Sequence, residues 1–132
     1  MQHLLEELDC RPPATNAAIA DCEKCLGMQL PTEYADFLRA TNGADGFLGK
    51  VAYVMLWAVD ELVPLNQEYE VKQYVPGLLL FGSDGAGEAF GFDTRVSPWQ
   101  IVQVPFVGME WAVARPLGTS FIEFLEQLYR LT

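Results

Sequence analysis

The stretch "FGSDGAGEAFGFD", residues 81–93, decides how the middle of the chain folds. Its thirteen residues include four glycines and three acids, a composition that also occurs in loops that hold phosphates or cations. Phe90 and Phe92 alternate with small or acidic residues, which is the period of a strand with one buried face. A leucine run, "LLLF" at 78–81, precedes the glycines. We therefore expect "LLLFG" and "EAFGFD" to form an antiparallel hairpin joined through "SDGAG".

Known glycine-rich ligand loops differ from this stretch. A dinucleotide fingerprint reads GxGxxG and opens a helix, whereas Gly85, Gly87 and Gly91 read GxGxxxG and enter a strand pattern. The Gly-Lys-Ser/Thr of a P-loop and the acidic pattern of an EF-hand are both absent. We interpret Gly85 and Gly87 as turn residues with positive φ, and Gly91 as leaving room for a bulky neighbour. The alternative is a cation or small ligand, and thus an enzyme or ligand-binding protein, that uses the loop carboxylates Asp84, Glu88 and Asp93.

Helical patterns flank the hairpin on both sides. Apolar residues at helical spacing predict three short helices in the first third of the chain, at 3–10, 16–26 and 31–41. At the other end, residues 119–131 carry apolar side chains at i, i+3, i+4 and i+7, which predicts a closing amphipathic helix. No linker, repeat or low-complexity segment interrupts the pattern.

Further strands are expected around the hairpin. Residues 51–59 are β-branched and aromatic and predict a mostly buried strand, and 101–107 and 111–115 predict two more. Helices, then a run of strands, then one helix indicate an α+β fold in a single domain, 1–132. Its architecture is N-terminal helices, a central sheet rich in antiparallel pairs, and a C-terminal helix packed on that sheet. The expected core side chains are Phe37, Leu38, Phe81, Phe90, Phe92, Phe121, Phe124 and Leu125.

The chain is strongly acidic, with 18 Asp and Glu against 8 Lys and Arg and a net charge of −10. Binding to nucleic acid phosphates needs clustered bases, and no basic run exists, so nucleic acid is excluded as a partner. The charge favours a protein partner with a basic surface, and the alternative is that it serves solubility alone. No apolar run reaches membrane-spanning length, and "MQHLLEELDC" lacks the basic and apolar regions of a signal peptide, so we expect a cytoplasmic protein without membrane contact.

Catalytic and metal-binding patterns are poor. His3 is the only histidine, so neither a Ser-His-Asp nor a Cys-His arrangement can be proposed, and we expect no enzyme and no cofactor. The three cysteines include a CxxC at 22–25, but no strand precedes it and a zinc site lacks its remaining ligands. Thiols buried in a helix are the default interpretation, and a redox or metal role of Cys22 and Cys25 stays open.

Five short motifs follow one another along the chain, in an order and spacing that run from about residue 16 to residue 129. They are I-x-x-x-E-x-x-L-G at 19–27, L-P-x-x-Y-x-x-F-L with a following N-G at 30–43, "LWAVDEL" at 56–62, the glycine-rich 78–93, and S-F-x-x-F-L within 120–128. In this order and spacing the chain resembles the SUKH superfamily, which contains the Smi/Knr-type cell-wall assembly regulators and many bacterial immunity proteins. Residues 96–115 carry less of the family pattern.

The resemblance implies an α+β fold and, in bacteria, an immunity protein that binds a polymorphic toxin, often a nuclease, and blocks it. It also implies an alternative, a Smi/Knr-type regulatory scaffold, although those proteins carry long disordered arms that this sequence lacks. Neither the partner, the binding face nor the oligomeric state follows from the sequence. The acids and the tryptophan that we expect to contact a basic protein are Glu61, Glu68, Glu70, Asp84, Glu88, Asp93 and Trp99.

Overall fold

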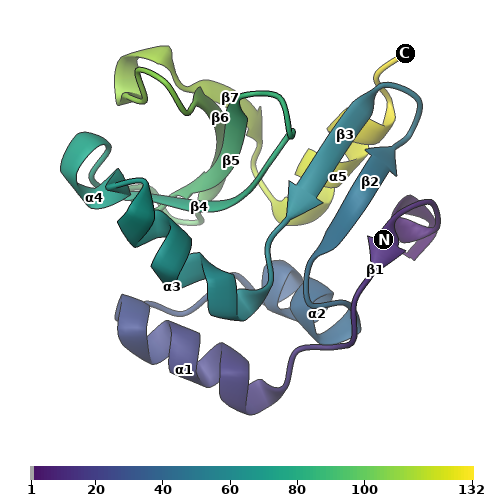
Figure 1. The fold of residues 1–132 in the computed structure, drawn as a ribbon, viewed down its shortest axis with the longest axis horizontal. Coiled ribbons are helices and arrows are strands. Elements are labelled where there is room, and N and C mark those ends of the chain that lie inside the picture. Colours follow the sequence, from purple (N-terminus) through teal and green to yellow (C-terminus); the bar gives the residue numbers. More distant parts are fainter. Residues whose placement is uncertain (1) are drawn as a thin grey trace.

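A computed structural model describes residues 2–132, and its centre is a seven-stranded antiparallel sheet in which the strands follow the order of the chain (Figure 1). The strands are β1 (Asp9–Cys10), β2 (Ala44–Leu48), β3 (Ala52–Leu56), β4 (Leu78–Ser83), β5 (Glu88–Asp93), β6 (Gln100–Pro105) and β7 (Arg115–Gly118). The helices are η1 (Gln2–Leu5), α1 (Asn16–Leu26), α2 (Thr32–Ala40), α3 (Val59–Glu68), α4 (Val71–Tyr74), η2 (Trp111–Val113) and α5 (Phe121–Tyr129). The predicted α+β class is confirmed.

The hairpin predicted at 81–93 is present, because β4 pairs antiparallel with β5. Gly85 and Gly87 have φ of 74° and 106°, values that side chains rarely adopt. The Asp84 carboxylate closes the turn, since its Oδ1 accepts hydrogen bonds from the backbone nitrogens of Ala86 (2.7 Å) and Glu88 (3.0 Å). A Cβ on Gly91 would lie 2.7 Å from Leu78 Cδ1, so this glycine does leave room for its neighbour.

Helix α5 covers one face of the sheet, as predicted. The ring of Phe124 meets those of Phe81 and Phe90 edge-on, with centroids 5.3 and 5.0 Å apart. Ser120 caps the helix, since its hydroxyl accepts a hydrogen bond from Glu123 N at 3.2 Å. All eight predicted core side chains are buried.

Helices α3 and α4, inserted between β3 and β4, cover the other face, and α1 runs beside α3 (Figure 1). Asn66 fastens α3 to the sheet: its amide donates to Leu80 O at 2.9 Å, and its Oδ1 accepts from Leu80 N at 2.9 Å. Beside this insertion β3 and β4 share a short register, Met55 with Ser83 and Leu56 with Gly82. The β2–β3 hairpin therefore meets the rest of the sheet over a narrow seam.

The N-terminal prediction was partly wrong. The helix expected at 3–10 is a 3-10 turn followed by the two-residue strand β1, which pairs with β2. The other two helices are present as α1 and α2, and Thr15 caps α1 by accepting a hydrogen bond from Ala18 N at 3.0 Å. Asp9 and Cys10 pair with β2. Tertiary pairing therefore overrides the helical pattern of residues 3–10.

Three predictions about the middle and the end of the chain also need correction. The strand expected at 51–59 ends at Leu56, and it is half exposed because Tyr53 and Met55 face outward. Residues 111–113 form a 3-10 turn, and the strand β7 begins only at Arg115. The closing helix ends at Tyr129.

None of the helices within residues 2–132 combines the length and the apolar character that crossing a bilayer requires.

Candidate functional site

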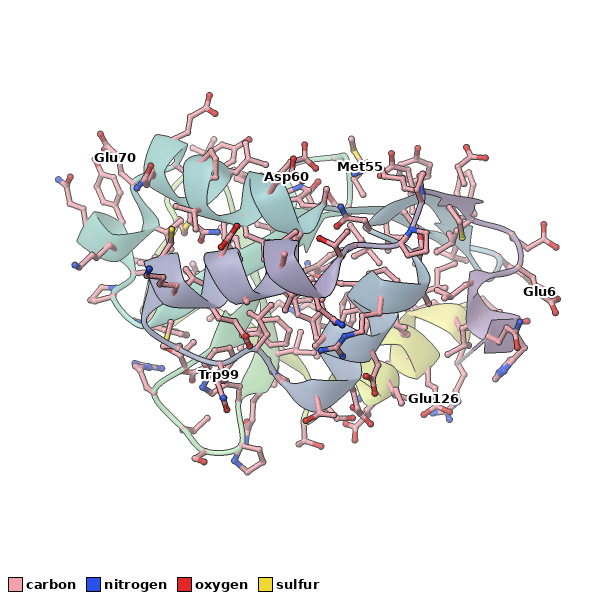
Figure 2. All side chains as sticks on the ribbon, turned by 90° about the horizontal axis from the view of Figure 1, so that it is seen from below. Glu6, Met55, Asp60, Glu70, Trp99 and Glu126 are labelled. Carbon is pink, nitrogen blue, oxygen red and sulfur yellow. The ribbon has the colours of Figure 1, made fainter. Side chains whose placement is uncertain are left out.

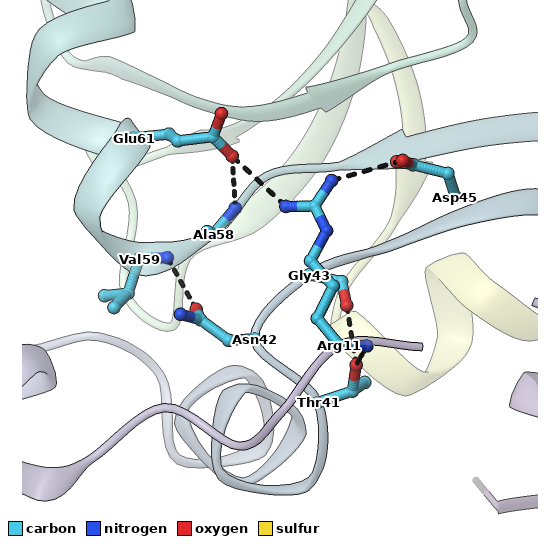
Figure 3. Close-up of polar contacts among 8 residues, drawn as sticks. All are labelled: Arg11, Thr41, Asn42, Gly43, Asp45, Ala58, Val59 and Glu61. Atoms are coloured by element: carbon cyan, nitrogen blue, oxygen red, sulfur yellow. Dashed lines mark hydrogen bonds and ion pairs between the residues drawn. The ribbon is translucent and has the colours of Figure 1, made fainter. Parts of the chain in front are cut away.

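The Asn42-Gly43 pair joins α2 and β2 to the start of α3 (Figure 3). Asn42 Oδ1 accepts a hydrogen bond from Val59 N at 2.7 Å and thereby satisfies a free N–H in the first turn of α3. Gly43 has a φ of 87°, and a Cβ on it would lie 2.5 Å from Leu56 O. The N-G motif thus serves to bring the β3–α3 joint against the end of α2.

Arg11 connects the N-terminal segment to β2 and to the start of α3 at the same joint. Its guanidinium donates to Glu61 Oε1 at 3.2 Å and to Asp45 Oδ2 at 3.1 Å (Figure 3). Glu61 Oε1 also accepts from Ala58 N at 2.8 Å, so this predicted partner-binding acid has a structural role at the N-terminus of α3. An acid suits that position because the helix dipole is positive there.

An acidic row runs along the exposed side of α3 and just beyond it, formed by Asp60, Glu61, Glu68 and Glu70. Helix α3 contains no basic residue. Within residues 2–132, none of Asp60, Glu68 and Glu70 takes part in an ion pair. Three of the four carboxylates are therefore uncompensated and accessible from outside.

The C-terminal end of the acidic row is unfavourable for the stability of the free protein. Glu68 ends α3, where the helix dipole is negative and repels a carboxylate by a few tenths of a kcal/mol to about 1 kcal/mol. Glu70 has a φ of 55°, which is the left-handed conformation and costs a non-glycine residue about 1 kcal/mol. The charge of Glu68 and the backbone of Glu70 therefore each cost the free protein some stability.

Three large apolar side chains lie exposed on the outer side of the β2–β3 hairpin, and we call them the hairpin patch: Phe47, Tyr53 and Met55. The exposed fractions of these residues are 54%, 39% and 40%. Phe47 and Tyr53 are cross-strand partners with ring centroids 5.2 Å apart. In Figure 2 Met55 lies along the same edge of the molecule as Asp60 and Glu70, so the patch and the acidic row share one side.

The glycine-rich turn borders the hairpin patch. A Cβ built on Gly85 would lie 3.4 Å from Met55 Sδ and 3.4 Å from Tyr53 Cδ2, which places the turn in van der Waals contact with the patch. Of the sequence-predicted residues, Asp84 therefore lies beside the patch, and Glu61, Glu68 and Glu70 lie in the acidic row.

The other three predicted residues lie elsewhere. Glu88 is on the face of the sheet that carries Phe90, since β-strand side chains alternate, and it accepts a hydrogen bond from Gln103 at 3.0 Å. Trp99 packs against Phe92, with ring centroids 5.7 Å apart, and lies on the edge opposite Met55 (Figure 2). Asp93 is 9% exposed and is engaged by Arg95. The three carboxylates of the 84–93 loop thus do not converge on one point.

Asp93 and Arg95 form a two-point contact beside Trp111. The guanidinium donates to both carboxylate oxygens, at 3.0 and 3.2 Å, and its carbon lies 3.4 Å above the Trp111 ring. The hydrogen bonds from Arg95 hold the pKa of Asp93 below its ordinary value, although partial burial acts in the opposite direction. The side chains of Asp93 and Trp111 are therefore accounted for within the fold.

Replacing Asp93 should change how stability depends on pH. Because the folded state lowers the pKa of Asp93, its contribution is fully present above about pH 4, the unfolded value, and is lost as the pH falls through the folded pKa. We expect Asp93→Asn to lower the urea midpoint at pH 7, and the difference from wild type to shrink steadily below pH 4. Arg95→Gln should remove the same acid-sensitive component, and a constant difference at every pH would contradict this assignment.

The CxxC pair is divided between core and solvent. Cys22 is buried on the inner side of α1, whereas Cys25 and Cys10 are exposed, and all three are free thiols. The default interpretation of buried thiols is thus correct for Cys22 and wrong for Cys25. The two residues are three positions apart on α1, and the boundary between its buried and exposed sides falls between them. No group of three or more potential ligands within residues 2–132 is arranged to hold a metal ion.

Thiol titration should separate the three cysteines. Burial, and then the charges of Cys25 and Glu23, raise the pKa of Cys22 to about 11. At pH 8 only about one Cys22 in a thousand is then a thiolate, and the sulfur is also shielded. We expect Ellman's reagent to modify two thiols rapidly in the native protein and the third only on unfolding, with Cys22→Ala abolishing the slow phase. Three equally fast thiols would contradict the buried position.

A groove of about 790 Å³ lies where α1, α3 and α4 meet β4. Its lining mixes apolar and polar groups and includes Cys25, Met28, Asn66 and Glu70. The Asn66 amide is already bonded to the backbone, and the remaining polar lining consists largely of the exposed side chains of Gln67, Glu70, Lys72 and Gln73.

The hairpin patch is not predictable from the sequence pattern of its two strands. Strand β2 contains Asp45 and Gly46, residues depleted in strands, and was not predicted. In β3 every residue of "AYVML" is apolar or aromatic. The sequence therefore lacks the alternation of polar and apolar residues that would distinguish the outer face of the strand from its inner face. The exposed tyrosine and methionine were therefore assigned to a buried strand.

The family motifs have structural explanations in this geometry. Glu23 accepts a hydrogen bond from Leu30 N at 2.8 Å and closes the α1–α2 elbow, where Gly27 has a φ of 70°. Tyr34 lies in the aromatic core between α2 and the sheet, with its ring 5.1 Å from those of Phe92 and Phe121. The motifs are thus determinants of the fold, and none contributes to the acidic row except "LWAVDEL", which supplies Asp60 and Glu61.

Comparison with known proteins agrees with the motifs. The model of the SMI1 / KNR4 family (SUKH-1) matches residues 13–127, from the segment before α1 to near the end of α5. No curated protein matches the chain. Because the family model spans most of the chain, this protein belongs to the SMI1 / KNR4 family (SUKH-1).

Proposed function

We propose that this protein is a non-catalytic immunity protein that binds and neutralises a toxin domain with a basic surface, made by the same bacterial cell. The observation that carries the proposal is the acidic row, in which Asp60, Glu68 and Glu70 are exposed and unpaired. Complementary charges on a partner would accelerate association and fix the register of the complex.

The unfavourable placement of two of these acids supports the proposal. Glu68 opposes the helix dipole and Glu70 occupies a left-handed backbone, so both reduce the stability of the free chain. Natural proteins retain such arrangements where function requires them. A cationic surface bound there would offset the repulsion between the Glu68 carboxylate and the helix dipole.

Co-expression tests the immunity role. The toxin encoded beside this gene should arrest growth when expressed alone, and growth should recover when this protein is present. The two proteins should also elute together on a sizing column. Failure of both rescue and co-elution would overturn the proposal, and capture of a fixed host enzyme in place of a toxin would favour a regulatory scaffold.

Charge reversal tests the binding face. We expect Glu68→Lys with Glu70→Lys to weaken the complex tenfold or more at low salt, chiefly through a slower association rate. Glu6→Lys with Glu126→Lys is a control of equal net charge, since Figure 2 places both residues away from Glu70. Equal weakening by the two pairs would indicate a general charge effect and exclude the acidic row as the contact.

A further inference from the structure

The hairpin patch is an exposed apolar feature on the side of the molecule that carries the acidic row. A surface phenylalanine or tyrosine is common by itself, but here two aromatic rings and a methionine adjoin on neighbouring strands. Side chains of these types are the ones most enriched at the desolvated centres of protein interfaces.

The side chains of the hairpin patch are restricted by contacts with one another and by the buried core beneath their strands. Phe47 and Tyr53 meet edge to face at 81°, which limits the freedom of both rings before any partner binds. The inner sides of the same strands are anchored in the core, where Leu48, Val54 and Leu56 are at most 1% exposed. Binding at this surface would therefore order few additional side chains, which lowers its entropic cost.

The surroundings of the patch are acidic. Asp45 pairs with Met55 across the strands and so shares its face, Asp84 lies in the bordering turn, and Asp60 lies along the same edge. Arg11 neutralises Asp45 through its ion pair. The acids near the patch without an ion-pair partner within residues 2–132 are therefore Asp60 and Asp84, and the nearby base without one is Lys50 at the hairpin tip. An apolar centre inside an acidic rim is complementary to an apolar protrusion inside a basic rim.

We propose that the hairpin patch is the desolvated centre of the partner interface, and that it receives apolar side chains flanked by lysines and arginines on a basic protein. This inference rests on the proposed function and adds the surface through which it acts. A second copy of this chain is a poor occupant, because it would bring Asp60 and Asp84 against the same acids of the other copy at a net charge of −10 per chain.

Binding of the purified toxin domain to variants of the full chain tests the inference. We expect Phe47→Ser with Tyr53→Ser to weaken binding at least tenfold, through faster dissociation, and the loss to persist at 0.5 M salt, roughly where surface charges are screened within a few ångström. The matched control is Val96→Ser, because Val96 is 41% exposed on the β5–β6 loop. Tyr53→Ala alone should give a smaller loss in the same direction, and circular dichroism should confirm that each variant is folded.

The outcomes separate the inference from the proposed function. If the complex forms equally well with the double variant, the hairpin patch is not the centre of the interface, and the proposed immunity role is unaffected. Absence of any complex overturns both. Sedimentation of the chain alone tests a second copy as the occupant. If the wild type is a dimer and the variant with Phe47→Ser and Tyr53→Ser is a monomer, the patch binds a second copy, and the inference of a basic partner at this surface is wrong.

Discussion

Replacing Gly43 by alanine is expected to destabilise the protein by about 3 kcal/mol or more. Its φ of 87° costs an alanine about 1–2 kcal/mol before any contact is considered. The new Cβ would also lie 2.5 Å from Leu56 O and 2.9 Å from Trp57 C, which are backbone atoms and cannot rotate away. The β3–α3 joint would have to shift, and with it the hydrogen bond from Val59 N to Asn42. Urea unfolding followed by circular dichroism measures the loss.

The matched control is Gly27→Ala. Gly27 also has a positive φ, 70°, but a Cβ there meets no atom within 4 Å. We expect this substitution to cost only the backbone strain, about 1–2 kcal/mol. If the two alanines cost the same, the close approach of Gly43 to the β3–α3 joint is not a determinant of stability. The difference between them thus isolates the steric part of the N-G motif.

Phe81→Ala should be the most damaging single truncation in the core, with an expected loss of about 3–5 kcal/mol. The ring centroid of Phe81 lies 4.6 Å from that of Phe92 and 5.3 Å from that of Phe124, so it connects the sheet to α5. Its other aromatic neighbours are Tyr34, Phe90 and Phe121. Removal would leave a cavity that these rigid rings cannot close.

Phe47→Ala is the comparison for Phe81→Ala. Phe47 is 54% exposed and makes one cross-strand ring contact, with Tyr53, so we expect a loss below about 1 kcal/mol. Urea midpoints for the two variants give both values in one experiment. A loss at Phe47 as large as that at Phe81 would mean that the hairpin patch serves stability, which would remove the main reason to regard it as a binding surface.

Local chemistry in the sequence is sufficient to predict the hairpin of β4 and β5 and the helices α1, α2 and α5. In each case neighbouring residues carry the information: Asp84, Gly85 and Gly87 form the turn, and Thr15 and Gly27 bound α1. The spacing of Phe121, Phe124 and Leu125 was enough to place α5 on the sheet. Charge alone suggested the acidic candidates for partner binding, without separating exposed acids such as Glu68 from paired ones such as Asp93.

Tertiary structure alone decided which side chains are exposed at the surface. Strand β2 forms despite Asp45 and Gly46, because β1 and β3 supply its hydrogen-bond partners from either side. Tyr53 and Met55 are exposed because the outer side of this hairpin is left open, which depends on where elements distant in the chain pack. Asp93 looks like its neighbouring acids in the sequence, yet Arg95 and burial withdraw it from the surface. Periodicity reports that a strand has two faces, but only packing determines which of two apolar faces remains in water.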